Sequence, residues 1–359
     1  MAETKTAQVG SRLLLTIACL IILIAGLQAA ESVVVPFLLA VFLSMIGTPP
    51  LVWLRGRGMP NALALLIVVL GFVFVLVGIG ALLGGSVNSF TQTMPLYQAR
   101  FVELLETTEA QIASWEFLEN WGVSLELSTV VGDFINPLRL LDYVGTLISG
   151  VVGFVSDFFL VSLMMIFMLT EASGLPAKVK AALGDGSGKL LQFSSVMTQV
   201  HRYLIIKTGI SLFTGLVLGT WVAILGVDFP ILWGLLAFLL NYIPNIGSIL
   251  AAVPPVLVSL IQPEGGLTLM LLVAAGYATV NIGMGNFIEP TLMGQRLGLS
   301  TLVVFLSLVF WGWVWGGVGM LLSVPLTMVV KILLQNSDEF RWIAVLLDKS
   351  PKVEARPAG

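Results

Sequence analysis

The sequence is poor in charged side chains and in the residues that most catalytic and metal sites require. Lys, Arg, Asp and Glu make up 10% of its 359 residues, against roughly 25% in a soluble globular domain. It has one cysteine and one histidine, which excludes a disulfide framework and the usual zinc and haem ligand sets. A net charge of −3 without a basic cluster argues against a nucleic-acid partner. No pattern indicates a catalytic site, a metal site, a cofactor or an ATP-binding loop.

Hydrophobic residues, by contrast, make up 57% of the chain. A helix needs about 20 apolar residues to cross a bilayer. The first apolar run follows Lys5 and Arg12, as in a signal peptide, but its length favours an uncleaved helix; cleavage is the alternative. The sequence therefore predicts an all-α, polytopic membrane protein with clear spans at residues 13–30, 33–54, 62–85, 144–170, 204–226 and 267–284.

Two further apolar stretches, 229–261 and 301–334, are too long for one crossing and too short for two. Each contains residues that weaken a helix, at 241–247 and at 311–317. We interpret both as broken helices or re-entrant hairpins; two full crossings with an extra turn are the alternative. Both stretches carry a Trp-Gly pair followed by a Val-Pro pair, at 233–234 and 253–254 in the first and at 311–312 and 324–325 in the second. They therefore form a faint internal repeat or resemble each other by chance.

The distribution of Lys and Arg predicts the orientation and the division of the chain. Residues 88–143 contain eight acidic and two basic residues, which favours an external location. A helix is expected there from about Leu96 to Trp121, beginning next to Pro95. An amphipathic helix at 189–204 would contact the membrane surface or another subunit. The expected division is 1–87 N-terminal transmembrane helices, 88–143 external (periplasmic) helical segment, 144–170 transmembrane helix, 171–203 cytoplasmic amphipathic segment, 204–335 transport core with broken hairpins, and 336–359 cytoplasmic tail.

Charged groups within a membrane are costly and are therefore candidates for function. Asp157 lies near the middle of the span 144–170 and would couple transport to protons or cations; an interhelical hydrogen bond is the alternative. Lys207 and Lys331 are expected to extend to the cytoplasmic interface. Asp228 is expected to be solvated in a short turn.

Polar residues gather in the segment 281–299. Asn281, Asn286, Glu289 and Arg296 are candidate substrate-binding residues, with Glu289 also a candidate for coupling. The glycines in this segment let backbone approach a ligand closely. Pro290 and Gly294 argue against a continuous helix here. An ion pair between Glu289 and Arg296 that only holds a loop is the alternative.

The first break supplies a second group of candidates, because Pro244 frees a carbonyl group. Freed backbone groups with amides suit a neutral, hydroxyl-rich solute or a partly dehydrated cation. The alternative is that the amides only satisfy the break itself. The substrate-binding candidates in this break are Asn241, Tyr242, Pro244, Asn245 and Gly247.

Several of these motifs resemble the autoinducer-2 exporter family. They are residues 241–247, 287–294, 297–304, 317–326 and 201–204. The resemblance implies secondary export of autoinducer-2, a small furanone- or polyol-like signal, across the bacterial inner membrane. It also implies a homo-oligomer, namely a pentamer, in contact with lipid, and an elevator-like or rocking motion of the broken helices. Some members resemble sodium or lithium/proton antiporters, so antiport is one alternative, and a non-transporting scaffold or channel is another.

Overall fold

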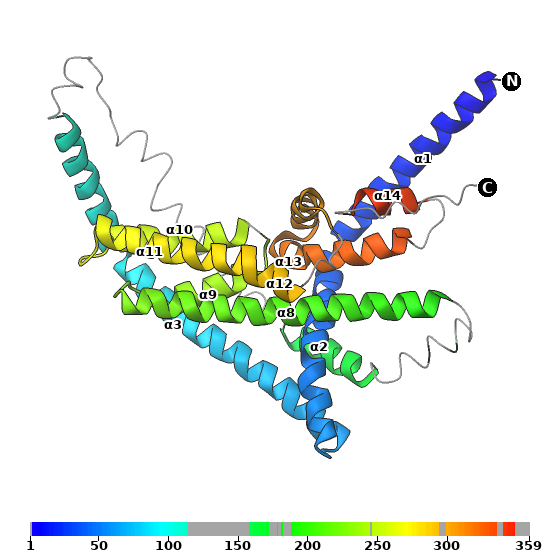
Figure 1. Ribbon diagram of the computed structural model, residues 1–359, viewed down its shortest axis with the longest axis horizontal. Coiled ribbons are helices and arrows are strands. Elements are labelled where there is room, and N and C mark those ends of the chain that lie inside the picture. The colour runs from blue at the N-terminus through cyan, green and yellow to red at the C-terminus, as the bar shows by residue number, and fades with distance from the viewer. Residues whose placement is uncertain are drawn as a thin grey trace. The chain divides into compact units, whose positions relative to one another are not determined.

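A computed structural model describes residues 2–113, 158–171, 178, 181, 188–244, 246–293, 299–335 and 340–348. Across these ranges the chain folds into helices and contains no strand (Figure 1). The prediction of an all-α, polytopic membrane protein is confirmed. The described helices that are long and apolar enough to cross a membrane are Glu31–Gly56, Asn61–Thr108, Met197–Ile224, Leu267–Leu292 and Thr301–Gln335.

The chain divides into two compact units. Unit 1 is drawn from Met1–Val69, Asp157–Leu204 and Leu297–Gly359, and unit 2 from Leu70–Ser156 and Ile205–Arg296. The segment 204–335, expected to form one transport core, is therefore shared between the two units.

Unit 1 contains α1 (Ala2–Ala29) and α2 (Glu31–Gly56), which pack against α13 (Thr301–Gln335). It also contains the apolar helix Phe158–Glu171. Helix α13 turns sharply where Trp315 and Gly316 leave helical geometry, with Gly316 at φ 56°. The break expected within 311–317 is therefore present, at its fifth and sixth residues.

Tryptophans hold this break in place. The rings of Trp311 and Trp315 stack at a centroid distance of 5.0 Å. The indole of Trp315 donates to the carbonyl oxygen of Leu27 in α1 at 3.1 Å. After the turn, Gly319 lies so close to the carbonyl of Trp311 that a Cβ atom there would overlap it. The two limbs of α13 thus fold back on each other.

The end of α13 is joined to the short helix α14 (Arg341–Leu346). Lys331 has a side chain that is 7% exposed, and its Nζ lies 3.3 Å from a carboxylate oxygen of Asp348. The backbone N–H of Ser300, just before α13, donates to the carbonyl of Leu347 at 3.1 Å. The expectation that Lys331 extends to the interface is therefore wrong, because it is buried against a carboxylate.

Helix α3 (Asn61–Ala113) is longer than expected. It is continuous across residue 88 and contains Pro95, so the prediction of a second helix beginning there is wrong. Phe90, Met94 and Tyr97 are each at most 4% exposed and lie on one helical face. Their packing extends across the proline and outweighs its cost of roughly 3 kcal/mol in a helix. The part of the expected helix beyond Ala113 lies outside the described residues.

Helix α8 (Gly188–Ile224) is likewise a single helix of 37 residues. The amphipathic segment 189–204 and the span 204–226 were expected as separate elements, and this separation is wrong. No proline interrupts the helix between them, so the same backbone hydrogen bonding continues.

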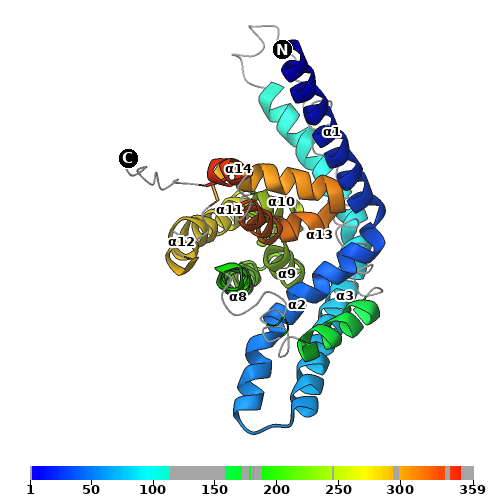
Figure 2. The same cartoon turned by 90° about the vertical axis from the view of Figure 1, so that its right-hand side faces the viewer.

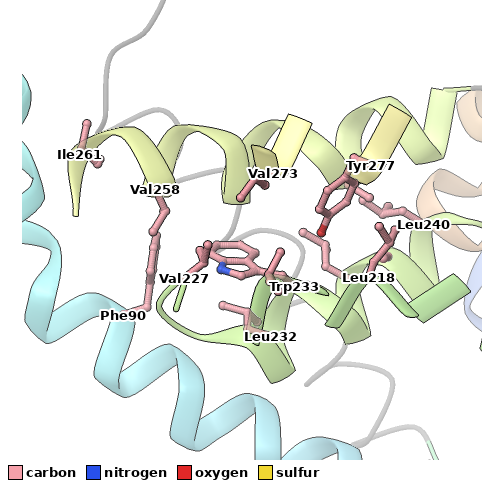
Figure 3. Close-up of a cluster of buried hydrophobic side chains, with 14 of the residues drawn as sticks. Phe90, Leu218, Val227, Leu232, Trp233, Leu240, Val258, Ile261, Val273 and Tyr277 are labelled. Atoms are coloured by element: carbon pink, nitrogen blue, oxygen red, sulfur yellow. The ribbon is translucent and has the colours of Figure 1, made fainter. Parts of the chain in front are cut away.

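Unit 2 also contains α9 (Pro230–Leu240), α10 (Ile246–Ile261), α11 (Leu267–Ile282), the π-helix η1 (Gly283–Ile288) and α12 (Glu289–Met293). Figure 2 shows α8, α9, α10 and α11 nearly end-on, gathered into a bundle. Their core surrounds Trp233, which is fully buried and meets the ring of Phe90 edge-on at 5.9 Å (Figure 3). Tyr277 and Val273 bring α11 into the same cluster.

Glycines set the spacing between the helices of this bundle. Gly215 and Gly219 on α8 face Gly234 on α9, and a Cβ atom on Gly219 would lie 3.1 Å from the Cα of Gly234. Small residues four apart let two helix backbones approach closely, as they do in membranes generally. On α11, Gly276 makes room for the indole of Trp221.

The turn between α8 and α9 is fixed by side chains from three elements. The Tyr97 hydroxyl donates to Asp228 Oδ2 at 2.6 Å, and the Asp228 backbone N–H donates to Gln262 Oε1 at 3.1 Å. The indole of Trp233 donates to the Asp228 carbonyl at 2.6 Å. Asp228 is therefore not in a freely solvated turn, as expected, but in a bonded one that sets the entry into α9.

Candidate functional site

A buried ion pair joins α8 to the start of α12. Lys207 Nζ lies 2.8 and 2.9 Å from the two carboxylate oxygens of Glu289. The Lys207 side chain is 4% exposed and that of Glu289 is 26% exposed. The expectation that Lys207 extends to the interface is therefore wrong. The partner of Glu289 in the described chain is Lys207, and Arg296, the partner considered from sequence, lies outside the described residues.

The first helix break, at 241–247, lies against the turn of α8 that follows Lys207. Asn241 Nδ2 donates to Ser211 Oγ at 3.0 Å, and the Tyr242 hydroxyl donates to Thr208 Oγ1 at 2.9 Å. Positions 207, 208 and 211 of α8 are spaced so that their side chains share one side of the helix. The ion pair and the break therefore meet along one short stretch of α8, and we call these six residues the α8 polar cluster: Lys207, Thr208, Ser211, Asn241, Tyr242 and Glu289.

The break itself is a tight turn whose backbone groups find local partners. The N–H groups of Tyr242 and Ile243 donate three residues back, at 3.3 and 2.9 Å, and that of Gly247 donates to the Ile243 carbonyl at 3.2 Å. Pro244 is half-buried within this turn. Gly247 packs against the Leu240 carbonyl, where a Cβ atom would overlap, so only glycine fits this position. The side chains of Asn241 and Tyr242 are thus directed to α8 and not to the break.

Glu289 is carried by a widened helical turn. Residues Gly283–Ile288 form a π-helix, and the helix continues from Glu289 through Pro290 to Met293. The expectation that Pro290 interrupts the helix is therefore wrong, because the helix runs from the π-helical turn through Pro290 to Met293. Single turns of π-helix occur frequently at functional sites.

Asn281 and Asn286 are not members of this cluster. Asn281 is half-buried near the end of α11, and Asn286 is exposed in η1. Neither is joined to the α8 polar cluster by a hydrogen bond in the described part of the chain. Asp157, Asn245 and Arg296 lie outside the described residues.

Sequence reasoning missed three members of the cluster, all on α8: Lys207, Thr208 and Ser211. A signal for them was present. Lys207 stands within an apolar run, and Thr208, Ser211 and Thr214 follow it at helical spacing. A charged residue followed by a polar stripe in a membrane helix indicates a face turned toward protein or water.

The cluster is electrically balanced, with one cation and one anion. Its other polar groups are three hydroxyls and one amide, which donate and accept hydrogen bonds without charge. Such a set suits a neutral solute with several hydroxyl groups. Among the described residues, no three His, Cys, Asp or Glu side chains are grouped to hold a metal ion.

Residues 17–339 match the model of the AI-2E family transporters. The chain belongs to this family. It is 39% identical to the AI-2 transport protein TqsA of Escherichia coli over 347 residues, which are 97% of this chain and 98% of that protein. It is also 40% identical to a transport protein of Haemophilus influenzae, in an alignment that covers 94% of this chain and 96% of that protein. Its identity to the transport protein YhhT of Escherichia coli is 34%, in an alignment that covers 97% of this chain and 97% of that protein.

The last two relatives are named only as transport proteins, without a substrate. Family membership and the apolar helices together identify this chain as a multi-pass transporter of the bacterial inner membrane. It is not an enzyme, which agrees with the sequence prediction.

Proposed function

We propose that this AI-2E family transporter exports AI-2 and that the α8 polar cluster binds it. The observation that carries the proposal is the Lys207–Glu289 ion pair, placed beside the hydrogen-bonded break at Asn241 and Tyr242. Helix breaks that bring polar groups together are the usual binding sites of secondary transporters. The substrate is supported by the name of TqsA, which is 39% identical to this chain.

The chemistry of the cluster fits a polyol-like signal. Thr208, Ser211 and Tyr242 offer hydroxyl groups, and Asn241 offers both an amide donor and a carbonyl acceptor. These groups are now bonded to each other in pairs, so a solute with several hydroxyls replaces those bonds one for one. A site of this kind selects for hydroxyl number and spacing, because an analogue lacking a hydroxyl leaves a buried polar group without a partner.

Glu289 supplies a route for coupling. While it is ionised, it compensates the charge of the buried Lys207 ammonium group. Protonation of Glu289 removes that compensation and makes the burial of the Lys207 ammonium group against α12 less favourable by several kcal/mol. A proton bound at Glu289 therefore favours a change in the packing of α8 against α12, which links proton movement to solute movement.

The test is AI-2 efflux from loaded proteoliposomes or inverted vesicles, with and without a pH gradient. Wild-type protein should carry AI-2 above empty vesicles, and Glu289→Gln should lose the dependence on the gradient. Glu171→Gln is the matched control, since Glu171 is an exposed carboxylate that also pairs with a lysine. Asp157→Asn examines the second coupling candidate in the same assay. Wild-type vesicles that carry no more AI-2 than empty ones would contradict the proposal.

Sodium or lithium/proton antiport is a second candidate, favoured by the same carboxylate, because an antiporter requires an ionisable group within the membrane. Proton release from vesicles on addition of sodium or lithium, abolished in Glu289→Gln and without AI-2 flux, would favour antiport over export.

We also propose that the protein forms a homo-oligomer. The resemblance to the family implies that this oligomer is a pentamer. Apolar side chains exposed on the helices, such as Phe74 at 80% and Phe159 at 81%, are available to lipid or to another copy. The mass of the purified protein in lipid nanodiscs would give the number of copies directly.

A further inference from the structure

Two buried hydroxyl groups in unit 2 are without a hydrogen-bond partner. They belong to Thr214 on α8, which is 2% exposed, and to Tyr277 on α11, which is 1% exposed. In the described part of the chain, neither oxygen has a donor or acceptor within bonding distance. A buried hydroxyl without a partner is destabilising, so each of these two groups calls for an explanation.

Thr214 differs in this respect from other helical threonines of the chain. A threonine in a helix readily donates to the carbonyl four residues back. Thr48, Thr93 and Thr107 all do so, at 2.7, 2.9 and 2.7 Å. The same bond is available to Thr214 and is not made. Its oxygen is buried without any hydrogen-bond partner in the described part of the chain.

The position of Thr214 follows from the two residues that lie seven positions before and after it on α8. Lys207, Thr214 and Trp221 lie two helical turns apart in succession and share one face of α8. At one end of this face Lys207 contacts Glu289, and at the other the indole of Trp221 donates to the carbonyl of Leu272 on α11 at 3.3 Å. Thr214 therefore lies midway along the face that α8 turns toward α11 and α12.

Tyr277 lies on the opposite side of the same interface. It follows Gly276, the residue that makes room for Trp221. Its hydroxyl points toward α8, on the side of Leu218, one turn from Thr214 (Figure 3). Other buried tyrosines of unit 2 do have partners, since Tyr97 donates to Asp228 and Tyr242 to Thr208.

We infer that Thr214 and Tyr277 form a second binding site for the hydroxyl groups of the transported solute. The inference rests on the proposed function and extends it along α8, from the α8 polar cluster toward Trp221. Each hydroxyl can donate one hydrogen bond and accept another. A neutral polyol that leaves Lys207 and Glu289 would next meet these two groups, which are not bonded to anything else. The site would accept hydroxyl-bearing solutes and disfavour ions, because neither the Thr214 nor the Tyr277 hydroxyl group carries a charge.

The test compares two variants that remove only the hydroxyls, Thr214→Val and Tyr277→Phe. If the groups bind solute, each variant should raise the AI-2 concentration for half-maximal flux about tenfold, the effect of one lost hydrogen bond of roughly 1.4 kcal/mol. The melting temperature of the purified protein should stay the same or rise, because a buried group without a partner has been removed. Thr48→Val and Tyr97→Phe are the matched controls, and neither should change the half-maximal concentration.

Unchanged half-maximal concentrations in both variants, with wild-type flux intact, would overturn the inference and leave the proposed function standing. If wild-type protein carries no AI-2, the proposed function fails, and the inference is then decided by binding. Glycerol, erythritol and ribitol would be compared for their stabilisation of wild-type protein and of both variants. Stabilisation that is weakened in the variants would support the inference. Stabilisation that is equal in all three proteins, or absent from all three, would overturn it.

Discussion

Gly215 and Gly234 bring α8 and α9 so close that a Cβ atom on Gly215 would lie 2.6 Å from the carbonyl oxygen of Gly234. This contact sets the separation of the two helices next to the helix break. Beyond it, one to two turns along the two antiparallel helices, Ser211 meets Asn241 and Thr208 meets Tyr242. A change in the separation of the two helices therefore changes the α8 polar cluster, although neither glycine belongs to it.

Gly215→Ala should lower both stability and transport. The added methyl group meets backbone and the Cβ of Phe238 at 2.8 Å, and overpacking of this kind costs about 1–3 kcal/mol. Gly209→Ala, on the same helix with no atom within 4 Å of its Cβ, should be neutral or stabilising by up to about 1 kcal/mol. Thermal unfolding and AI-2 flux of both variants would check this. Equal effects of the two substitutions would show that the glycine contact is not what positions the break.

The ion pair should respond unequally to the loss of its two members. Glu289→Gln leaves the Lys207 ammonium group, 4% exposed, without its counter-charge, and we expect a loss of about 3 kcal/mol or more. Lys207→Met leaves a carboxylate that is 26% exposed and partly solvated, so its loss of stability should be smaller.

The double variant, which carries both substitutions, contains no unbalanced charge. It should recover most of the stability and none of the coupled transport. Melting temperatures in detergent at several salt concentrations provide the measurement. A double variant less stable than Glu289→Gln would contradict this account of the pair.

The break in α13 should depend on Gly316 and Gly319 and not on Gly317. Gly316 has a left-handed φ of 56°, which costs about 1–2 kcal/mol for a residue with a side chain. A Cβ on Gly319 would overlap the carbonyl of Trp311, whereas one on Gly317 meets no atom within 4 Å. Alanine at each position, followed by thermal unfolding, should destabilise in the first two cases only. A large effect at Gly317 would argue against this geometry.

The carboxyl-terminal helix should stabilise unit 1 through Asp348. A chain that ends at residue 340 lacks the carboxylate that Lys331 contacts and the Leu347 carbonyl that Ser300 contacts. We expect its melting temperature to fall by several degrees, and Asp348→Asn should reproduce part of the fall. A chain that ends at residue 349 keeps both contacts and should melt like the full-length protein. Equal melting of all four chains would contradict the role of this contact.

The elements that depend on local composition could be predicted from sequence. The span expected at 33–54 corresponds to α2 at Glu31–Gly56, and the break expected at 241–247 separates α9 from α10. Apolar length and the placement of glycine, asparagine and proline are properties of short segments. They therefore determine where a helix can cross a membrane and where it must stop.

The continuity of α3 could not be predicted in this way. Pro95 is a strong local signal for a helix start, but Phe90, Met94 and Tyr97 pack against α9 and its preceding turn on both sides of it. The contacts that decide the outcome come from residues more than 100 positions away. Tertiary packing therefore overrides the local preference at this proline.

The site could be predicted only in part, for the same reason. Glu289, Asn241 and Tyr242 were identified because each is a polar residue next to a break in an apolar run. Their partners on α8 were not, because Lys207 and Glu289 are 82 positions apart in the chain. Local spacing suggested Arg296, seven residues from Glu289, as the partner instead.

The π-helix at Gly283–Ile288 makes the site depend on how this turn of helix is wound as well as on the identity of its residues. Such a turn contains one residue more than an α-helix would, and one residue corresponds to a rotation of about 100° around the axis. Glu289 thereby reaches the face of Val273 and Tyr277, where an uninterrupted α-helix would place Ile288. If the same residues were wound as a regular α-helix, the carboxylate would turn away from Lys207 and the apolar side chain of Ile288 would take its place. The register of one helical turn thus decides whether this bundle contains an ionisable group at its centre.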